Sequence, residues 1–255
     1  MVLLSYEVQE YKMTFSRNDI HTKNAVAKEY IRQLNSVLPC SLENLIRKAY
    51  ELSPEIAAFC SDATTPKLGA KDKGKIGKLV EFHIFGRLPN NDSHADTSFG
   101  DCKATHVKKC ADGYNAKERL TLTNCGATSD YANLQHIIDA QTLDASRCYG
   151  KIQTGILTVL REDEMVVALF RYDITELSAE YKEVIADDYQ KIRDCVAAKA
   201  ASQKGQSYLH IHPHGSKGSS TRAFGFTNAF VTRLISHYTG KPLEVKGRSI
   251  FIKDI

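Results

Sequence analysis

The chain has 255 residues, of which 42% are hydrophobic, and a formal net charge of +4 with nine histidines in addition. This length holds one large α/β domain or two small ones, and the hydrophobic fraction is that of a soluble globular protein with a core. The charge is compatible with a polyanionic partner, but so small an excess does not by itself indicate one.

The cysteines and the start of the chain argue against several protein classes. The seven cysteines are odd in number and widely spaced and contain no CxxC pair, so neither a disulfide framework nor a zinc motif is expected. Residues 1–4 are too short for the core of a signal peptide, and no long apolar run follows. We therefore expect a soluble, intracellular, cytoplasmic protein without a membrane segment.

The first part of the chain is predicted to be mainly helical. Ser41 can cap a helix that carries Leu42, Leu45, Ile46 and Tyr50 on one face. Residues 61–72 are polar and contain a proline and a glycine, so they are predicted to form a loop. We expect residues 1–65 to form a helical segment and residues 66–255 the main domain, packed together as one compact unit.

The next predicted helix runs from about Lys73 to Phe85. Its core-facing stripe is Ile76, Leu79, Val80, His83 and Ile84. Lys73, Gly77 and Glu81 lie on a different ridge of this helix. Gly74 and Gly77 each lower helix stability by about 1 kcal/mol relative to alanine. That cost suggests that another backbone or a ligand comes close to the helix here.

The remainder of the chain mixes strands and helices. Strands are predicted at residues 96–108, 116–125, 208–213 and 249–252, with a hairpin formed by 152–160 and 165–170. Helices are predicted at residues 175–201 and 228–238. Because the order is not a strict βαβ alternation, we expect an α/β protein of the α+β type, with a mixed central sheet flanked by helices.

The segment from Glu81 to Lys103 carries the residues with the clearest chemistry. Asp101 and Lys103 are two residues apart on a predicted strand and therefore point to the same face, with Asp96 just before them. Two carboxylates and an ammonium can hold a divalent metal ion and a water molecule, as hydrolysis of a phosphodiester requires. The alternative is a solvated strand with scattered charges, since a short acid-x-Lys motif is common.

Five segments in the same order resemble the PD-(D/E)XK nucleases, in particular the branch of the mismatch-repair endonuclease MutH and the related restriction enzymes that cut at GATC. The first segment is the start of the helix, from Lys73 to Glu81. The second is the acidic segment that contains Asp96, Asp101 and Lys103. The others are residues 117–125, Lys151 ahead of an apolar strand, and residues 208–214 followed by the helix from 228. The resemblance covers most of the chain from Lys73 onward and implies a restriction-endonuclease-like fold.

By this resemblance, Asp96 and Asp101 would bind Mg²⁺, with Glu81 completing the acidic cluster. Lys103 would orient or activate the attacking water, and Lys151 and Lys73 match family lysines, although both could be plain surface lysines. The chain departs from the family at Asp101, where relatives usually have glutamate, and in the shorter gap after Asp96. Asp92 is therefore a second candidate for the first metal ligand.

The candidate DNA-reading residues lie near the end of the chain. His210, His212 and His214 alternate on a short predicted strand, so they share one face and could contact DNA, form a polar surface or, less favoured, bind zinc. Lys217 and Arg222 belong to a small, basic segment that could fold onto phosphates or simply be a solvent loop.

The resemblance implies an Mg²⁺-dependent, sequence-specific endonuclease for double-stranded DNA, most like a type II restriction enzyme with a GATC-like site. The alternatives are a MutH-like mismatch-repair nicking endonuclease and a non-catalytic DNA-binding module of the same fold. A zinc hydrolase built on the histidine strand is the weakest alternative. The expected partner is double-stranded DNA, with a homodimer on DNA as one arrangement and no membrane contact.

Overall fold

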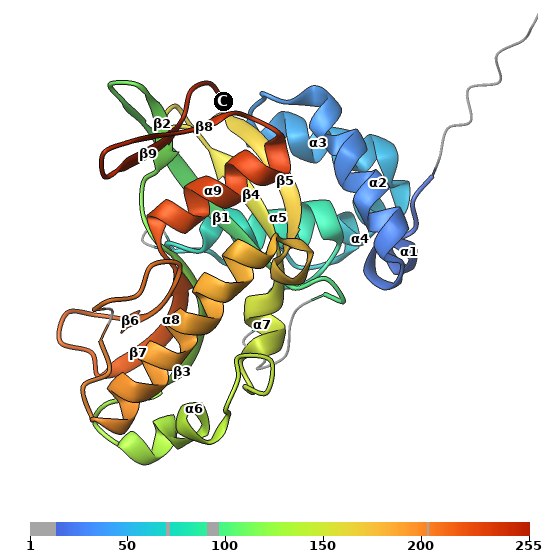
Figure 1. Cartoon of the computed structure of the whole chain (residues 1–255). Coiled ribbons are helices and arrows are strands. Elements are labelled where there is room, and N and C mark those ends of the chain that lie inside the picture. Colours follow the sequence, from blue (N-terminus) through green and yellow to red (C-terminus); the bar gives the residue numbers. More distant parts are fainter. Residues whose placement is uncertain (1–13, 70–71, 91–96, 203) are drawn as a thin grey trace, which may run out of the picture.

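A computed structural model describes residues 14–69, 72–90, 97–202 and 204–255 of the chain. These residues fold as a mixed α+β protein with a six-stranded central sheet and a separate three-stranded sheet, both flanked by helices (Figure 1). This confirms the fold class expected from the sequence. The helices are α1 (Arg17–Thr22), α2 (Asn24–Leu34), α3 (Leu42–Leu52), α4 (Pro54–Asp62), α5 (Lys75–Phe85), α6 (Gln135–Asp139), α7 (Tyr149–Gln153), α8 (Ala179–Ala197) and α9 (Asn228–Thr239).

The strands of the central sheet lie in the order β5-β4-β1-β2-β9-β8. β1 pairs in parallel with β4, whereas every other neighbouring pair is antiparallel. β3, β7 and β6 form the second sheet, which is antiparallel. The strands are β1 (Asp101–Cys110), β2 (Gly113–Ala116), β3 (Leu120–Ala127), β4 (Thr154–Leu160), β5 (Val166–Asp173), β6 (Leu209–Pro213), β7 (Thr221–Phe226), β8 (Leu243–Lys246) and β9 (Ser249–Ile252).

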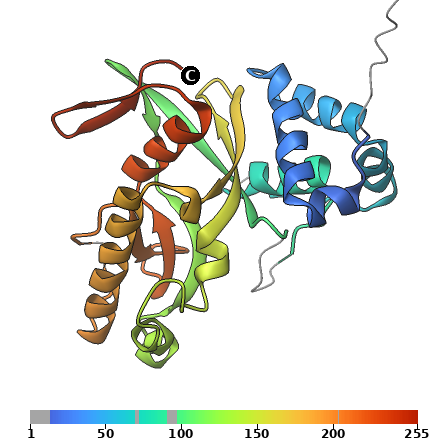
Figure 2. The ribbon, with the colours of Figure 1, turned by 45° about the vertical axis from the view of Figure 1, so that its right-hand side comes forward.

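Each face of the central sheet packs into its own hydrophobic core, because successive residues of a strand point to opposite faces. On one face, Cys102 and Ile156 join residues of α2, α3 and α5. On the other, Leu157 and Val159 pack with α8, α9 and the inner face of the three-stranded sheet. The N-terminal helices and α9 accordingly lie on opposite sides of the sheet (Figure 2). The N-terminal helices thus share a core with the sheet rather than forming one of their own.

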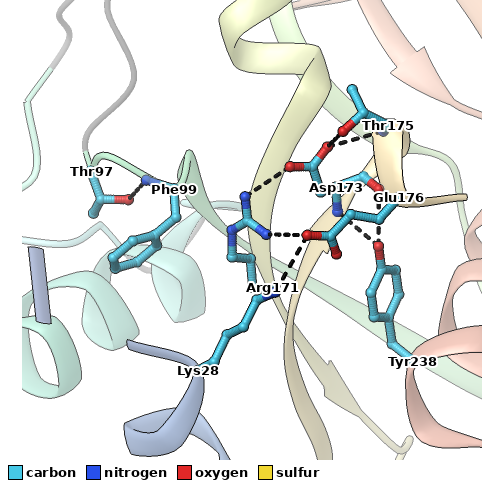
Figure 3. A network of polar contacts seen from close by, with 8 residues as sticks. All are labelled: Lys28, Thr97, Phe99, Arg171, Asp173, Thr175, Glu176 and Tyr238. Carbon is cyan, nitrogen blue, oxygen red and sulfur yellow. Dashed lines mark hydrogen bonds and ion pairs between the residues drawn. The ribbon is translucent and has the colours of Figure 1, made fainter. Parts of the chain in front are cut away.

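Ion pairs also join the N-terminal helices to the edge strand β5 (Figure 3). The Arg171 guanidinium, whose side chain is only 8% exposed, lies 2.8 Å from Asp173 Oδ2 and 3.4 Å from Glu176 Oε1. Lys28 of α2 lies 3.3 Å from the same Glu176 oxygen. The Tyr238 hydroxyl of α9 donates to the backbone carbonyl of Asp173 and accepts from its N–H. One end of β5 is therefore tied to helices on both sides of the sheet.

Several predicted elements are confirmed. Ser41 caps α3 by accepting a hydrogen bond from the Asn44 N–H at 3.2 Å. The predicted hairpin forms as β4 and β5, and β6, α9 and β9 also occur where the sequence placed them. Of the stripe of α5 that was predicted to face the core, only Val80 and Ile84 are buried. Gly77 and Glu81, on the other ridge, are buried as well, because α3, α4 and β1 all pack around this helix.

Other boundaries differ from the predictions. β1 begins at Asp101, because residues 97–100 form a tight turn, and Asp96 lies outside the described residues. α5 begins at Lys75, which leaves Lys73 in the turn before it. α8 covers only the middle of the helix predicted at 175–201, since the 3-10 helix η3 (Ile174–Glu176) precedes it. The strands β2, β7 and β8 and the short helices α6 and α7 were not predicted. Two further 3-10 helices are η1 (Asn35–Val37) and η2 (Tyr131–Leu134).

No disulfide links the seven cysteines, all of which lie in the described part of the chain. Among the helices that the structure describes, none is long and apolar enough to cross a lipid bilayer.

The buried carboxylate of Asp188 anchors the three-stranded sheet to α8. It accepts hydrogen bonds from the backbone N–H groups of Ser207, Tyr208 and Leu209, at 2.7, 2.5 and 2.9 Å. Burial raises the pKa of Asp188, and these three hydrogen bonds oppose that rise. The start of β6 is thereby fixed in position by a side chain about twenty residues earlier in the chain.

Replacing Asp188 by alanine should lower the free energy of unfolding by about 3 kcal/mol, because buried N–H groups lose a charged acceptor. Asp187→Ala is the matched control, since its carboxylate is 62% exposed and pairs with Lys191 on the same helix. That change should have an effect of about 0.5 kcal/mol or less. Urea unfolding followed by circular dichroism measures both, and equal losses would contradict the anchoring role.

Candidate active site

The Asp101 carboxylate lies at the centre of a small charged group at one end of the central sheet. Its side chain is 5% exposed, and its Oδ2 atom is 2.9 Å from Lys103 Nζ and 3.7 Å from Lys151 Nζ. Lys103 follows on the same face of β1, as the sequence predicted. The two lysine side chains are 24% and 16% exposed, so an anion from solvent can approach their ammonium groups.

The parallel pairing of β1 and β4 explains why Lys151 belongs to this group. Asp101 is the first residue of β1 and is paired with Gly155 near the start of β4. Parallel strands start at the same end of a sheet, so the segment that enters β4 lies beside Asp101. That segment is α7, which carries Lys151. The structure therefore brings together three of the predicted catalytic residues, Asp101, Lys103 and Lys151.

Glycines allow the surrounding backbone to come close to Asp101. A Cβ at Gly77 of α5 would lie 2.9 Å from the carbonyl oxygen of Cys102, so the helix rests directly on β1. Gly100 has φ +100°, and a Cβ there would lie 2.0 Å from the carbonyl oxygen of Thr154. The close approach inferred from the glycine content of this helix is confirmed at Gly77.

Glu81 lies on the same ridge of α5, one turn after Gly77, and is 4% exposed. The helix packs on the sheet face to which Cys102 points, whereas strand alternation directs Asp101 and Lys103 to the opposite face. Glu81 can therefore meet Asp101 only around the end of β1, where the two faces join.

The other predicted catalytic and metal-binding residues are placed differently. Lys73 is exposed in the turn that precedes α5, and it is not part of the charged group around Asp101. Asp96 and its substitute Asp92 lie outside the described residues. Within the part of the chain that the structure describes, no three His, Cys, Asp or Glu side chains gather closely enough to hold a metal ion.

Tyr172 is a neighbour of this group that the sequence analysis did not identify. It is paired with Gly155, which is in turn paired with Asp101, so the three residues form one row across β5, β4 and β1. The Tyr172 hydroxyl oxygen lies 2.7 Å from the position that a Cβ would take at Gly155. Burial and, second, the Asp101 charge raise the pKa of Tyr172. Its only signal in the sequence is an aromatic residue within an apolar strand.

Of the predicted DNA-reading histidines, His210 and His212 lie on one face of β6 and are buried, whereas His214 follows the end of the strand. His210 and His212 are 5% and 1% exposed, with ring centroids 4.7 Å apart, and His212 Nε2 lies 3.1 Å from the Thr121 hydroxyl. A Cβ at Gly225 of β7 would lie 2.7 Å from the His212 ring and 3.1 Å from the His210 ring, so both rings lie close against this strand. His214 is exposed.

Burial lowers the pKa of His210 to about 4 and that of His212 to about 3, and the nearby positive charge of Arg119 adds to both shifts. Both rings are therefore neutral near pH 7. A neutral imidazole offers one donor and one acceptor, in place of the charged fork of an arginine.

The last two predicted DNA contacts are Lys217, in the basic loop between β6 and β7, and Arg222, near the start of β7. Lys217 is exposed at the tip of this loop. Arg222 donates hydrogen bonds to the backbone carbonyls of Ala201, Ser219, Ser220 and Thr221, at 3.1 to 3.3 Å. The Arg222 guanidinium thus holds the loop in place, and any contact with a phosphate would compete with these bonds.

Neither a scan against protein-family models nor a search of curated proteins finds a match for this chain. A function must therefore follow from the residues of the site and their geometry.

Gly77→Ala should destabilise the protein by about 1 to 3 kcal/mol, because the added methyl group would push α5 away from the backbone of β1. Gly150→Ala is the control, since nothing lies within 4 Å of a Cβ at that helical position. It should be neutral or stabilising by up to about 1 kcal/mol. Thermal unfolding of both variants measures the difference, and a stable Gly77→Ala protein would contradict the close contact.

Acid should loosen the three-stranded sheet. Folding favours the neutral rings of His210 and His212, so their contribution to stability is complete above pH 6.5 and is lost as the pH falls toward 4. The midpoint of thermal unfolding should therefore fall from pH 7 to pH 4.5, and less steeply in the variant His210→Gln/His212→Gln. Identical slopes for the two proteins would contradict this.

Proposed function

We propose that this protein is a divalent-metal-dependent endonuclease that hydrolyses phosphodiester bonds in double-stranded DNA. The observation that carries the proposal is the buried Asp101 carboxylate held between Lys103 and Lys151 at the start of a central strand. A buried ion pair seldom stabilises a protein more than well-packed apolar side chains do. Such a group at the end of a sheet, with both ammonium groups partly exposed, is better explained by chemistry than by stability.

The donor set fits Mg²⁺ in type. Mg²⁺ prefers hard oxygen ligands and usually takes one or two carboxylates, with waters and substrate phosphate oxygens completing its shell. Asp101 would supply one carboxylate, and Glu81 is the second candidate among the described residues. The chemistry that Mg²⁺ supplies in such a site is a nucleophilic water at neutral pH and neutralisation of phosphate charge.

The lysines supply the remaining chemistry. In a phosphodiester substrate, negative charge grows on the phosphoryl oxygens and on the leaving oxygen as the bond breaks. Lys103 would orient the attacking water or stabilise this charge, and Lys151 would contact the phosphate that is cut. Lys103 and Lys151 place two positive charges beside the Asp101 carboxylate, and these charges favour the approach of an anionic substrate.

The resemblance to the MutH-like branch of the PD-(D/E)XK nucleases makes the proposal narrower. It favours an enzyme that acts at a GATC-like site and leaves 5′-phosphate and 3′-hydroxyl ends. A restriction enzyme is favoured over a mismatch-repair nicking enzyme, because residues 1–70 do not match the repair enzyme closely and the histidine motif departs from it. His214 and Lys217, both exposed beside β6, are the residues of the predicted reading element best placed to touch DNA. A module that binds DNA without cutting it is the competing outcome of the test below.

Asp101→Ala and Lys103→Ala should each reduce Mg²⁺-dependent cleavage of DNA by at least about 100-fold, because each removes a group that acts in the transition state. Both variants should still bind DNA in a gel-shift assay without Mg²⁺. Lys191→Ala, an exposed lysine of α8, is the control and should cut normally.

The substrates are plasmids with and without adenine methylation at GATC, and the cut ends are mapped by sequencing. Normal cleavage by either site variant would refute the proposed site. Binding by the unaltered protein without any cleavage would instead favour the non-catalytic module.

A further inference from the structure

We propose that the open edge of β8 is an interface for a second copy of this chain, with the two β8 strands paired antiparallel about a two-fold axis. The inference goes beyond the proposed nuclease function and does not depend on it, because Asp101 lies on β1, separated from β8 by β2 and β9. Three observations carry it: an uncovered backbone edge, an exposed valine, and a charge pattern that complements itself.

The two edges of the central sheet differ in how they are covered. At β5, Cys40 exchanges backbone hydrogen bonds with Val166. The Asn35 side chain bonds both the N–H and the carbonyl of Leu169 on the same strand. β8 pairs with β9 alone, in a hairpin that extends outward (Figure 1, Figure 2), and the structure shows no hydrogen bond to its other side from any described residue. Such an edge presents backbone groups to which another strand can add.

The turn of this hairpin decides which backbone groups of β8 face the open side. Lys246 directly precedes the two-residue turn, and residues that flank such a turn form a hydrogen-bonded pair. Hydrogen-bonded and non-hydrogen-bonded pairs alternate along antiparallel strands, so Glu244 also bonds to β9. The N–H and carbonyl groups of Leu243 and Val245 therefore point away from β9, where a second strand can bond to them.

Charge selects the register of this pairing. When two antiparallel copies are centred on Val245, each Glu244 lies opposite Lys246 of the other copy. A slip of two residues would set Glu244 opposite Glu244 in one direction and Lys246 opposite Lys246 in the other, and like charges directly opposite each other are destabilising. A slip of one residue would leave the outward backbone groups without partners. Of these registers, only the one centred on Val245 satisfies both charge and backbone.

Val245 supplies the apolar part of the interface. Its side chain is 59% exposed, and Leu88 is the only other large hydrophobic side chain in the described part of the chain that is exposed. Val245 is paired with Ile250 of β9, so these two side chains lie on one face of the hairpin. At the two-fold axis, the Val245 side chains of the two copies would pack against each other, with Ile250 of each copy beside them.

The ion pairs that Glu244 and Lys246 make within the chain do not prevent this exchange of partners. Glu244 lies 3.5 Å from Lys253, and Lys246 lies 3.2 Å from Asp112, but all four side chains are exposed. Exposed pairs of this kind contribute little stability. β8 has four residues, whereas a standard interface uses about 20 to 30 from each partner, so we expect a weak and reversible dimer.

The test exchanges the charges in one copy at a time. Glu244→Lys sets lysine opposite lysine, and Lys246→Glu sets glutamate opposite glutamate, so each variant alone should dimerise at least about 10-fold more weakly than the unaltered protein. In an equimolar mixture of the two variants every lysine again faces a glutamate, and the dimer should return. Sedimentation equilibrium without DNA, at protein concentrations from about 1 to 300 µM, measures the dimer in each sample.

A backbone variant tests the same edge independently of charge. Val245→Pro removes an N–H that points to the open side but no bond to β9, and edge strands tolerate proline, so the fold should be kept while dimerisation is lost. Leu88→Ala, at the other exposed hydrophobic residue, is the control and should dimerise normally. Circular dichroism checks the fold of each variant.

Three outcomes would overturn the inference. The first is an unaltered protein that stays monomeric over the whole concentration range. The second is a Glu244→Lys or Lys246→Glu protein that dimerises as strongly as the unaltered chain. The third is a mixture of these two variants that is no more dimeric than either variant alone. None of these measurements involves DNA cleavage, so failure of the interface and failure of the proposed nuclease function remain distinguishable.

Discussion

The parallel pairing of β1 with β4 is the contact on which the rest of the site depends. Because both strands start at the same end of the sheet, Asp101 at the start of β1 meets Lys151 just ahead of β4. A shift of one residue in this register would turn Asp101 and Lys103 toward the opposite face. The absence of a side chain at Gly100 allows the two strand starts to come this close, because a Cβ there would collide with the carbonyl of Thr154.

The layers on either side of the sheet give this end of β1 a rigid support. α5 rests on the backbone of β1 at Gly77, and the N-terminal helices close the core behind it. The Arg171 ion pairs join the same helices to β5, the strand that carries Tyr172. The catalysis proposed for Asp101, Lys103 and Lys151 needs such support, since small displacements of reacting groups reduce catalysis strongly.

The two regions singled out for function differ in their electrostatics. At the start of β1, charged groups are paired with one another and partly exposed, so an anionic substrate or a metal ion can change their partners. On β6, burial keeps His210 and His212 neutral, and their rings pack over β7. The first arrangement is the one on which the proposed phosphodiester chemistry rests, whereas the second contributes shape and a few hydrogen bonds.

The sequence by itself determined the local features: the cap at Ser41, the β4–β5 hairpin, the α9 helix, and the placement of Asp101 and Lys103 on one face of a strand. Each depends on residues close together in the chain, whose spacing decides which way they point. Only the tertiary structure decided that Lys151 joins them, that Tyr172 reaches across Gly155, and that His210 and His212 are buried. These depend on which strands pair and in which register, and that is set by packing between segments far apart in the sequence.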